Sequence, residues 1–370
     1  MASKDAAVAA NRNLGDARKA KDDEFYTQLA DIERELRHYK SHLKDKVVYC
    51  NCDDPWVSNF FHYFSYNFEK LGLTKLITTC YKSQQWDLFS QNDAEQAIYL
   101  EYEGDRNHNM VPDPAEIGIK PLKGDGDFRS AETINLLKQA DIVATNPPFS
   151  LFREYVAQLM EHKKKFLIVG NQNAVTYKEI FPLVKDNRLW YGPSIQSGDR
   201  EFGIPDWYPL NAAGSRIDED GRKYIRVKGV RWFTNMEYPQ RHEDLILYKN
   251  YTPDEYPTYD NYDAIEVGAT KHIPSDYNGA MGVPITFLDK YNPDQFEIVG
   301  MTQSWCGAAS KLYPRQTQVN ADGQRSLVMK LNDGAAIKVT SPPEDKTYYE
   351  VDGDLFVKVY ARILIRNKRL

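Results

Sequence analysis

The first half of the chain alternates short apolar runs with segments in which apolar residues recur every three or four positions. Runs rich in β-branched and aromatic residues predict strands, and the second pattern predicts amphipathic helices. Strands are predicted at 47–50, 75–81, 97–102, 141–145, 166–169 and 189–191, and helices within 1–40 and at 56–71, 131–139, 151–165 and 177–186. This alternation is typical of a doubly wound, mostly parallel α/β sheet of Rossmann-like type, in which ligands bind at the carboxyl ends of strands.

The pattern changes after Gly192. The helical periodicity stops, a loop-like stretch covers 192–222, and the later apolar runs are short, which predicts strands. These runs lie at 224–227 and 231–233, which look like the two strands of a hairpin, and at 245–248, 296–299 and 360–365. We therefore expect an α/β domain at 1–250, which includes an N-terminal helical segment at 1–40, and a mixed, mainly β domain at 251–370.

One predicted strand is followed by a segment with candidate chemistry, Asn146-Pro147-Pro148-Phe149. The side-chain carbonyl of Asn146 and the backbone carbonyl of Pro147 can each accept a hydrogen from a planar amino group, and the prolines restrict φ so that these oxygens can converge. Phe149 can stack on the flat face of a base that has been extruded from a duplex. The arrangement suits activation of a weakly nucleophilic amino group. The alternative is a Pro-Pro turn that only ends the strand.

This motif resembles the signature of amino adenine methyltransferases, and further segments resemble the EcoRI-type modification methylase family. They are Glu24-Phe25-Tyr26-Thr27, Asn51-Cys52-Asp53-Asp54-Pro55, Trp232-Phe233-Thr234-Asn235, the stretch 282–288 and the stretch 361–366, so the resemblance spans nearly the whole chain. It implies an S-adenosylmethionine-dependent enzyme that methylates N6 of a flipped adenine in a specific duplex DNA sequence. It also implies that 1–250 is the catalytic domain and 251–370 the target-recognition domain.

The same resemblance implies a set of cofactor contacts. Tyr26 and Thr27 would contact the methionine end of S-adenosylmethionine, and Asp53 and Pro55 lie in the turn after the first strand, where an acid can hold an ammonium group. An N-cap role before a helix is the alternative for Asp53. The glycine-rich turn usual in such sheets is missing, because Trp56 and its neighbours stand where small residues are expected.

Two further cofactor candidates follow later strands. Tyr81 ends the second strand, which lacks the acid that commonly binds ribose, and it could pack on the cofactor's adenine or simply in the core. Asp127 and Phe128 lie in a segment that resembles the motif whose Asp accepts the cofactor's exocyclic amine and whose apolar neighbour flanks the ring. A plain Asp-Gly turn is the alternative.

The charge distribution suggests where DNA could bind. A net charge of -6 excludes a basic coat over the whole surface, but specific binding needs only one positive face. We select Arg222, Lys223, Arg226, Lys228 and Arg231 as DNA-binding candidates, and a C-terminal group of Arg362, Arg366, Lys368 and Arg369 is a second basic cluster. Either could instead be a solvated charged face.

Other features exclude several classes. Four cysteines are too few and too irregular for a disulfide framework, and the histidines lack metal-ligand spacing, so no metal is expected. No leader or membrane-spanning run is evident, so we expect a cytoplasmic protein. The expected partners are double-stranded DNA and a cognate restriction endonuclease of the same system, with no physical complex implied. The alternatives are methylation of RNA adenine or protein glutamine, or a non-catalytic nucleic-acid-binding protein with this fold.

Overall fold

The computed structural model describes residues 26–52, 58–79, 97–109, 112, 116–196, 199–204, 210 and 214–370. The chain forms two compact units, one of Met1–Ala174 with Leu189–Tyr238 and the other of Val175–Arg188 with Pro239–Leu370. The predicted sites at Asp53, Pro55 and Tyr81 lie outside the described residues, as do the first 25 residues of the predicted helical segment.

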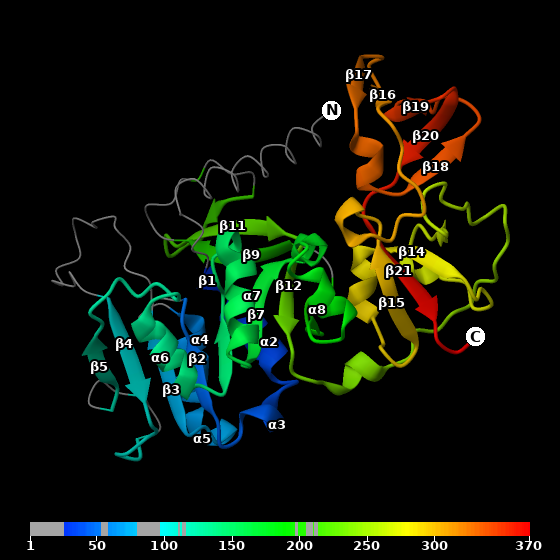
Figure 1. The fold of residues 1–370 in the computed structure, drawn as a ribbon. Coiled ribbons are helices and arrows are strands. Elements are labelled where there is room, and N and C mark those ends of the chain that lie inside the picture. Colours follow the sequence, from blue (N-terminus) through cyan, green and yellow to red (C-terminus); the bar gives the residue numbers. More distant parts are fainter. Residues whose placement is uncertain are drawn as a thin grey trace. The chain divides into compact units, whose positions relative to one another are not determined.

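An eight-stranded mixed sheet forms the centre of the first unit (Figure 1). Its order is β5 (Gly118–Pro121), β4 (Ile98–Tyr102), β3 (Lys75–Thr79), β2 (Val47–Cys50), β6 (Ile142–Thr145), β7 (Lys165–Asn171), β12 (Val230–Thr234) and β8 (Trp190–Tyr191). The middle strands β3, β2, β6 and β7 are parallel, and the outer strands on both sides pair antiparallel. The parallel strands coincide with the most continuous apolar runs because such strands are buried on both faces.

The helices of the first unit pack on this sheet. They are α2 (Leu29–Leu36), α3 (Lys40–Leu43), α4 (Asn59–Tyr66), α5 (Phe68–Leu71), α6 (Ala131–Gln139) and α7 (Phe152–Glu161). Side chains of α2, α4 and α5 share one apolar cluster with alternate residues of β2, β6, β7 and β12. Side chains from α7 contact the other set, since the ring of Phe152 packs against Phe233 at 4.9 Å.

Local signals explain where the helices begin and end. The Ser58 hydroxyl accepts from the Phe61 N–H at the start of α4, and the Ser130 hydroxyl accepts from Thr133 N–H at the start of α6. Helix α5 ends at Gly72, whose φ of 66° is the left-handed conformation that favours glycine. The helices predicted at 56–71 and 131–139 therefore correspond to α4 with α5 and to α6.

A second, four-stranded antiparallel sheet completes the first unit. Its order is β1 (Tyr26–Thr27), β9 (Asp199–Ile204), β11 (Lys223–Lys228) and β10 (Arg216–Ile217). The hairpin predicted from 224–227 and 231–233 is wrong, because β11 and β12 belong to different sheets. The intervening Gly229 has a φ of 69° and redirects the chain, so the two strands do not pair with each other.

The second unit is mainly β. One sheet has the order β13 (Ala264–Glu266), β14 (Ala280–Pro284), β21 (Arg362–Asn367) and β15 (Phe296–Met301). Another has the order β17 (Arg325–Val328), β16 (Gln316–Val319), β19 (Tyr348–Val351), β20 (Asp354–Lys358) and β18 (Ala336–Val339). The predicted helix at 177–186 is reduced to α8 (Phe181–Lys185), whose Phe181 packs on Trp305 in this unit. The runs predicted at 296–299 and 360–365 correspond to β15 and β21.

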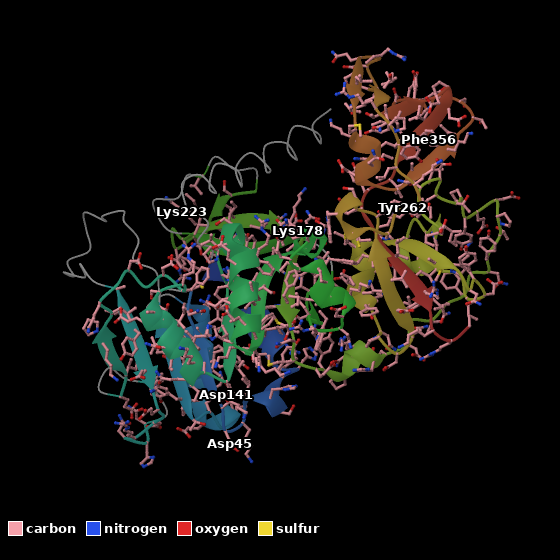
Figure 2. The ribbon with its side chains drawn as sticks, viewed as in Figure 1. Asp45, Asp141, Lys178, Lys223, Tyr262 and Phe356 are labelled. Carbon is pink, nitrogen blue, oxygen red and sulfur yellow. The ribbon has the colours of Figure 1, made fainter. Side chains whose placement is uncertain are left out.

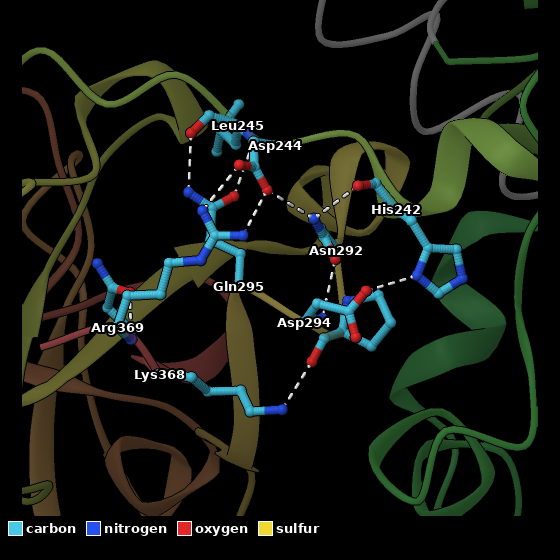
Figure 3. Close-up of polar contacts among 10 residues, drawn as sticks. His242, Asp244, Leu245, Asn292, Asp294, Gln295, Lys368 and Arg369 are labelled. Atoms are coloured by element: carbon cyan, nitrogen blue, oxygen red, sulfur yellow. Dashed lines mark hydrogen bonds and ion pairs between the residues drawn. The ribbon is translucent and has the colours of Figure 1, made fainter.

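The predicted strand at 245–248 is wrong. Leu245 donates its N–H to the Gln295 side chain at 2.8 Å and accepts from the same amide at 2.9 Å, so a side chain takes the place of a neighbouring strand (Figure 3). Ile246 and Tyr248 are 84% and 64% exposed. The run of four apolar residues therefore does not form a buried strand.

Short 3-10 helices connect many of these elements. They are η1 (Phe149–Leu151), η2 (Gln172–Thr176), η3 (Pro239–His242), η4 (Thr270–His272), η5 (Ile285–Lys290), η6 (Ser304–Cys306) and η7 (Lys330–Asp333). Across the described residues, the helices are all too short or too polar to cross a membrane. Among the described residues, Cys50, Cys52 and Cys306 are not joined by disulfides, and Cys50 is buried.

Candidate active site

The candidate site lies where the strand order reverses. The chain passes from β2 to β3 on one side and returns to β6 on the other side of β2, so the carboxyl ends of β2 and β6 form the switch point of the parallel strands. Open α/β sheets bind ligands at such a point. Asp45 and Asp141, which precede β2 and β6, mark the opposite edge of the sheet in Figure 2.

The segment Asn146-Pro147-Pro148-Phe149 leaves β6 at this edge. Asn146 is 6% exposed and Pro147 is buried, whereas Phe149 is half-buried and packs against the main apolar cluster. Pro148 has a φ of -54°, and its carbonyl accepts from Leu151 N–H at 3.0 Å, which starts η1. The segment is thus anchored at both ends by β6 and by η1, as the sequence predicts for a rigid turn.

A tyrosine from α7 ties this edge to the end of β2. Tyr155 donates its hydroxyl to the side-chain oxygen of Asn51, the residue directly after β2. Both side chains are buried, and burial raises the pKa of Tyr155 well above its usual value, so the hydroxyl stays protonated and remains a donor. Since α7 begins just after Phe149, one hydrogen bond links the loops that follow β2 and β6.

The predicted cofactor residues Asp127 and Phe128 have defined partners here. The ring of Phe128 meets that of Tyr155 edge to face at 5.1 Å and is 5% exposed. Arg129 binds the Asp127 carboxylate in a bidentate manner, with contacts of 2.9 and 2.6 Å, and also reaches Glu154 at 3.0 Å. The Asp127 carboxylate raises the pKa of Arg129. Sequence reasoning did not select Arg129, although its place two residues after Asp127 was a usable signal.

Tyr26 and Thr27 form β1, and the structure brings them to the start of α4. The Thr27 carbonyl accepts from the side-chain amide of Asn59, the first residue of α4, at 2.7 Å. The segment with Asp53 and Pro55 connects β2 to α4 in sequence, so Thr27 lies beside the helix that follows the β2 loop.

Thr27 also offers an unused polar atom. The side chain is 5% exposed, and its hydroxyl oxygen has no hydrogen-bond partner among the residues that the structure describes. Leaving a buried hydroxyl unpaired costs about 1–3 kcal/mol, so a bound ligand that pairs with it would recover that cost. The observation fits a cofactor at this position.

A buried carboxyl group lies on α2, the helix that follows β1. Glu35 of α2 accepts hydrogen bonds from Ser194 N–H and from the Tyr39 hydroxyl, both at 2.9 Å. Burial raises its pKa to about 7, with these hydrogen bonds opposing the shift. Sequence reasoning missed Glu35, since its spacing within an amphipathic helix did not distinguish it from the exposed acids.

The basic candidates divide into two groups. Arg222, Lys223, Arg226 and Lys228 lie on β11 or just before it, with Arg226 and Lys228 exposed on the same face. In Figure 2, Lys223 lies at the opposite end of the unit from Asp141. The end with Lys223 is the side of the carboxyl edge. Arg231 differs, because it lies in β12, is 2% exposed and donates to the Val230 and Gln196 carbonyls at 2.8 and 3.0 Å. Arg231 is therefore a buried residue and does not belong to the group of surface cations with which the sequence analysis placed it.

The C-terminal basic cluster is engaged within the second unit. Arg369 binds Asp244, and Lys368 donates to the Pro293 carbonyl at 2.9 Å (Figure 3). Arg362 binds Glu266 at 2.6 Å and Arg366 lies 3.9 Å from Glu297. These pairs favour the structural alternative for this cluster. Among the described residues, no three His, Cys, Asp or Glu side chains gather as metal ligands would.

One cavity lies away from this edge. It has a volume of about 370 Å³ and is lined by residues of α2 to α5, among them Tyr63 and Leu71. Helix α5 leads into the start of β3, so this cavity belongs to the amino-terminal edge of the sheet. It is not where a switch-point ligand would bind.

Comparison with known proteins adds an independent line of argument. The family described as "Adenine-specific methyltransferase EcoRI" matches residues 13–368. The Type II methyltransferase M.EcoRI of Escherichia coli is 52% identical over 293 residues, which cover 79% of this chain and 89% of that protein. The Type II methyltransferase M.MpnI of Mycoplasma pneumoniae is 41% identical over 290 residues, 76% of this chain and 83% of its own length. No solved structure matches the chain.

Proposed function

This chain belongs to the EcoRI family of adenine-specific methyltransferases, and from that premise we propose how its residues methylate adenine in DNA. The enzyme is a site-specific DNA methyltransferase that acts on adenine. The observation that carries the residue-level proposal is the position of Asn146 and Pro147 at the carboxyl edge of β6, beside the end of β2.

We propose S-adenosylmethionine as the methyl donor. When bound, it supplies a methyl group already activated by attachment to a sulfonium. Thr27 would pair with the cofactor through its buried hydroxyl, and Tyr26 would lie beside it. Asp127 would accept the exocyclic amine of its adenine, with Phe128 beside the ring and Arg129 fixing the carboxylate. Asp53, Pro55 and Tyr81 stay proposed contacts on the resemblance alone.

The proposed chemistry needs two hydrogen-bond acceptors at the amino group. As N6 would take the methyl group, the bond between that methyl group and the sulfonium would break, and the methylated nitrogen would release a proton to solvent. The side-chain carbonyl of Asn146 and the backbone carbonyl of Pro147 would accept the two hydrogens of adenine N6, which draws electron density toward the nitrogen that attacks. Phe149 would stack on the extruded base, recovering about 1–3 kcal/mol of the cost of flipping. The half-buried position of Phe149 is compatible with that contact.

The finer fold assignment is part of the same proposal. A doubly wound, Rossmann-like methyltransferase sheet agrees with helices packed on the two sets of side chains of the parallel strands. We propose 1–250 as the catalytic region and 251–370 as the target-recognition region. Within the first, Arg222, Lys223, Arg226 and Lys228 would contact phosphates, whereas buried Arg231 would hold the loop at Gln196.

The test is transfer of labelled methyl groups to duplex DNA by Asn146→Ala and by Asn135→Ala, an exposed position on α6. Loss of the acceptor should reduce turnover by at least about a hundredfold, since one preorganised transition-state contact of this kind contributes roughly 2.7–4 kcal/mol. Duplex binding should stay within a few fold. Full turnover in Asn146→Ala would refute the acceptor role.

A parallel assay separates the substrate alternatives. The wild-type protein is incubated with duplex DNA, RNA and a glutamine-containing protein acceptor, and label is expected in DNA alone. Label confined to RNA or protein would overturn the substrate, because the same acceptor pair could serve any planar amino group.

A cognate restriction endonuclease and a cytoplasmic location complete the proposal. Adenine methylation of a specific site protects it from a nuclease that reads the same sequence, and both enzymes act on DNA within the cell. Sequencing of methylated adenines in cells that express the protein would give the site, and cleavage of unmethylated DNA at that site by a neighbouring gene product would test the pairing.

A further inference from the structure

The second unit contains an edge hairpin with an unusual surface, formed by β16 and β17 with the flanking residues 311–330. Strand β17 is the outermost strand of its five-stranded sheet, so one of its backbone edges has no neighbouring strand (Figure 1). Its residues Arg325, Ser326 and Leu327 are exposed. An exposed edge strand of this kind needs either protection or a partner.

The charge of the hairpin differs from that of the whole chain. Four basic residues and one acidic residue lie in 311–330, in a protein of net charge -6. Lys311 and Arg325 are held by Asp260 and Glu350. Arg315 and Lys330 are exposed, and no ion pair of either occurs in the described part of the chain. Two cations are thus available for phosphate groups.

The apolar residues of the hairpin are also exposed. Leu327 is 63% exposed and Met329, just after β17, is 52% exposed. Cross-strand pairing places Leu327 opposite Thr317 and Ser326 opposite Gln318, so apolar and polar side chains alternate between the faces. One face therefore presents Leu327 and Thr317 together. A Thr hydroxyl can pair with base edges, and apolar groups contact the thymine methyl group in the major groove.

We propose that this edge hairpin enters the major groove of the target duplex and reads part of the recognition site. A two-stranded ribbon fits that groove. Arg315 and Lys330 contact phosphates and set the register, whereas Leu327 and Thr317, which pair across the two strands on one face, contact the bases. The proposal rests on the proposed function and names the part of the second unit that gives it sequence selectivity.

A second copy of the chain is the other conceivable occupant of an open strand edge. Edge-to-edge pairing would bring two basic hairpins together, and like charges opposite each other are destabilising. The charge of the hairpin is complementary to a polyanion instead. This favours DNA over self-association.

The phosphate contacts are tested with the full chain and the double variant Arg315→Ala/Lys330→Ala. Losing two phosphate contacts should lower the slope of log affinity against log salt by about 1.8, with weaker binding to every duplex sequence. The matched control is Lys338→Ala, an exposed lysine on β18 at the other edge of the same sheet, paired with Asp354. An unchanged slope in the double variant would overturn the phosphate assignment.

Base reading is tested by the methylated sites that Leu327→Ser and Thr317→Val leave in the DNA of cells expressing them. Relaxed preference at one or two positions of the site is expected, with turnover on the original site reduced about tenfold or more per lost contact. An unchanged site and unchanged turnover would overturn the proposal. The proposal would also be overturned if sedimentation showed that the wild type is a dimer, and if Leu327→Ser dissociated this dimer without changing DNA selectivity. If the wild type methylates no DNA, the proposed function itself has failed.

Discussion

Tyr155 joins the loops after β2 and β6 through a single hydroxyl. Tyr155→Phe keeps the ring contact with Phe128 and removes the hydrogen bond to Asn51. We expect a loss of about 1–2 kcal/mol in unfolding free energy and a several-fold increase in the KM for S-adenosylmethionine, with a smaller change in kcat. Chemical denaturation and steady-state kinetics measure the two effects.

The control for that variant is Tyr191→Phe. Tyr191 is similarly buried and donates its hydroxyl to the Gln172 carbonyl at 3.0 Å, but it lies in β8 at the sheet's outer edge. It should lose stability without the change in KM. An equal change in KM in both variants would show that the effect is general destabilisation.

Glu35 predicts a specific dependence of stability on pH. Its folded pKa of about 7 lies above the ordinary value of 4.5, so the folded state binds a proton more tightly. Its favourable contribution is therefore complete below pH 4.5 and is lost as pH rises to about 7, by the order of 3 kcal/mol. Glu35→Gln should lack this component in denaturation curves measured across that range.

The comparison variant is Glu33→Gln, an exposed acid on the same helix. It should follow the wild-type curve. If the stability difference between Glu35→Gln and wild type were constant from pH 4 to pH 8, the buried carboxyl would not titrate as described.

At the scale of single residues, the sequence identified the turn after β6 but not the partners of several charged side chains. The turn formed by Asn146 and Pro147 was recognisable because prolines restrict φ locally. Arg129 and Glu35 were not selected, and Arg231 was placed on the surface, because an ion pair or a buried charge depends on residues distant in sequence. Local pattern does not report whether a charged side chain faces solvent.

Among the elements, Gly229 separates two strands that the sequence predicts as a pair. It adopts a φ of 69°, and a Cβ there would lie 3.1 Å from the Gln172 side chain. Gly229→Ala should reduce the unfolding free energy by about 1–2 kcal/mol from the left-handed conformation, with a further loss from crowding. Thermal or chemical denaturation measures the change.

Gly221→Ala isolates the conformational part of that loss. Gly221 has a φ of 81°, and a Cβ there would meet nothing within 4 Å. It should therefore be less destabilising than Gly229→Ala. Equal losses would mean that the contact with Gln172 contributes nothing.

Element prediction succeeded at the continuous apolar runs of the parallel strands and missed later strands, among them β14, whose residues 281–283 are buried. The continuous apolar runs at β2, β6 and β7 identified parallel strands, and serine caps located α4 and α6. The segment 245–248 is also a continuous apolar run, but Ile246 and Tyr248 are exposed, and the Gln295 side chain rather than a strand pairs with Leu245. A pattern of apolar residues does not show whether another part of the protein covers them.

For the whole molecule, the two units are not consecutive in sequence. Residues 175–188 belong with 239–370, and Phe181 of α8 is buried against Trp305. The single domain boundary that the sequence predicts near residue 250 does not include this arrangement, because a helical pattern does not show which hydrophobic core the helix joins. The functional assignment of the two regions stays a prediction.

A fragment ending at residue 250 tests this arrangement. It would keep α8 without the strands on which it packs, so Phe181 would be exposed, and we expect aggregation measurable by sedimentation. Replacing 175–188 with a Gly-Ser linker in the same fragment should restore a monomer. If the unmodified fragment is monomeric and stable, α8 does not depend on the second unit.

The placement of α8 sets an order on folding as the chain leaves the ribosome. The helix emerges before β8 and β12, and long before β15, on which it packs. The strands that complete the eight-stranded sheet can therefore assemble before the last third of the polypeptide, which contains the partner strand of α8, has been synthesised. A ribosome that stalls in that interval would present an apolar helix to chaperones from a nascent protein whose larger sheet is already closed.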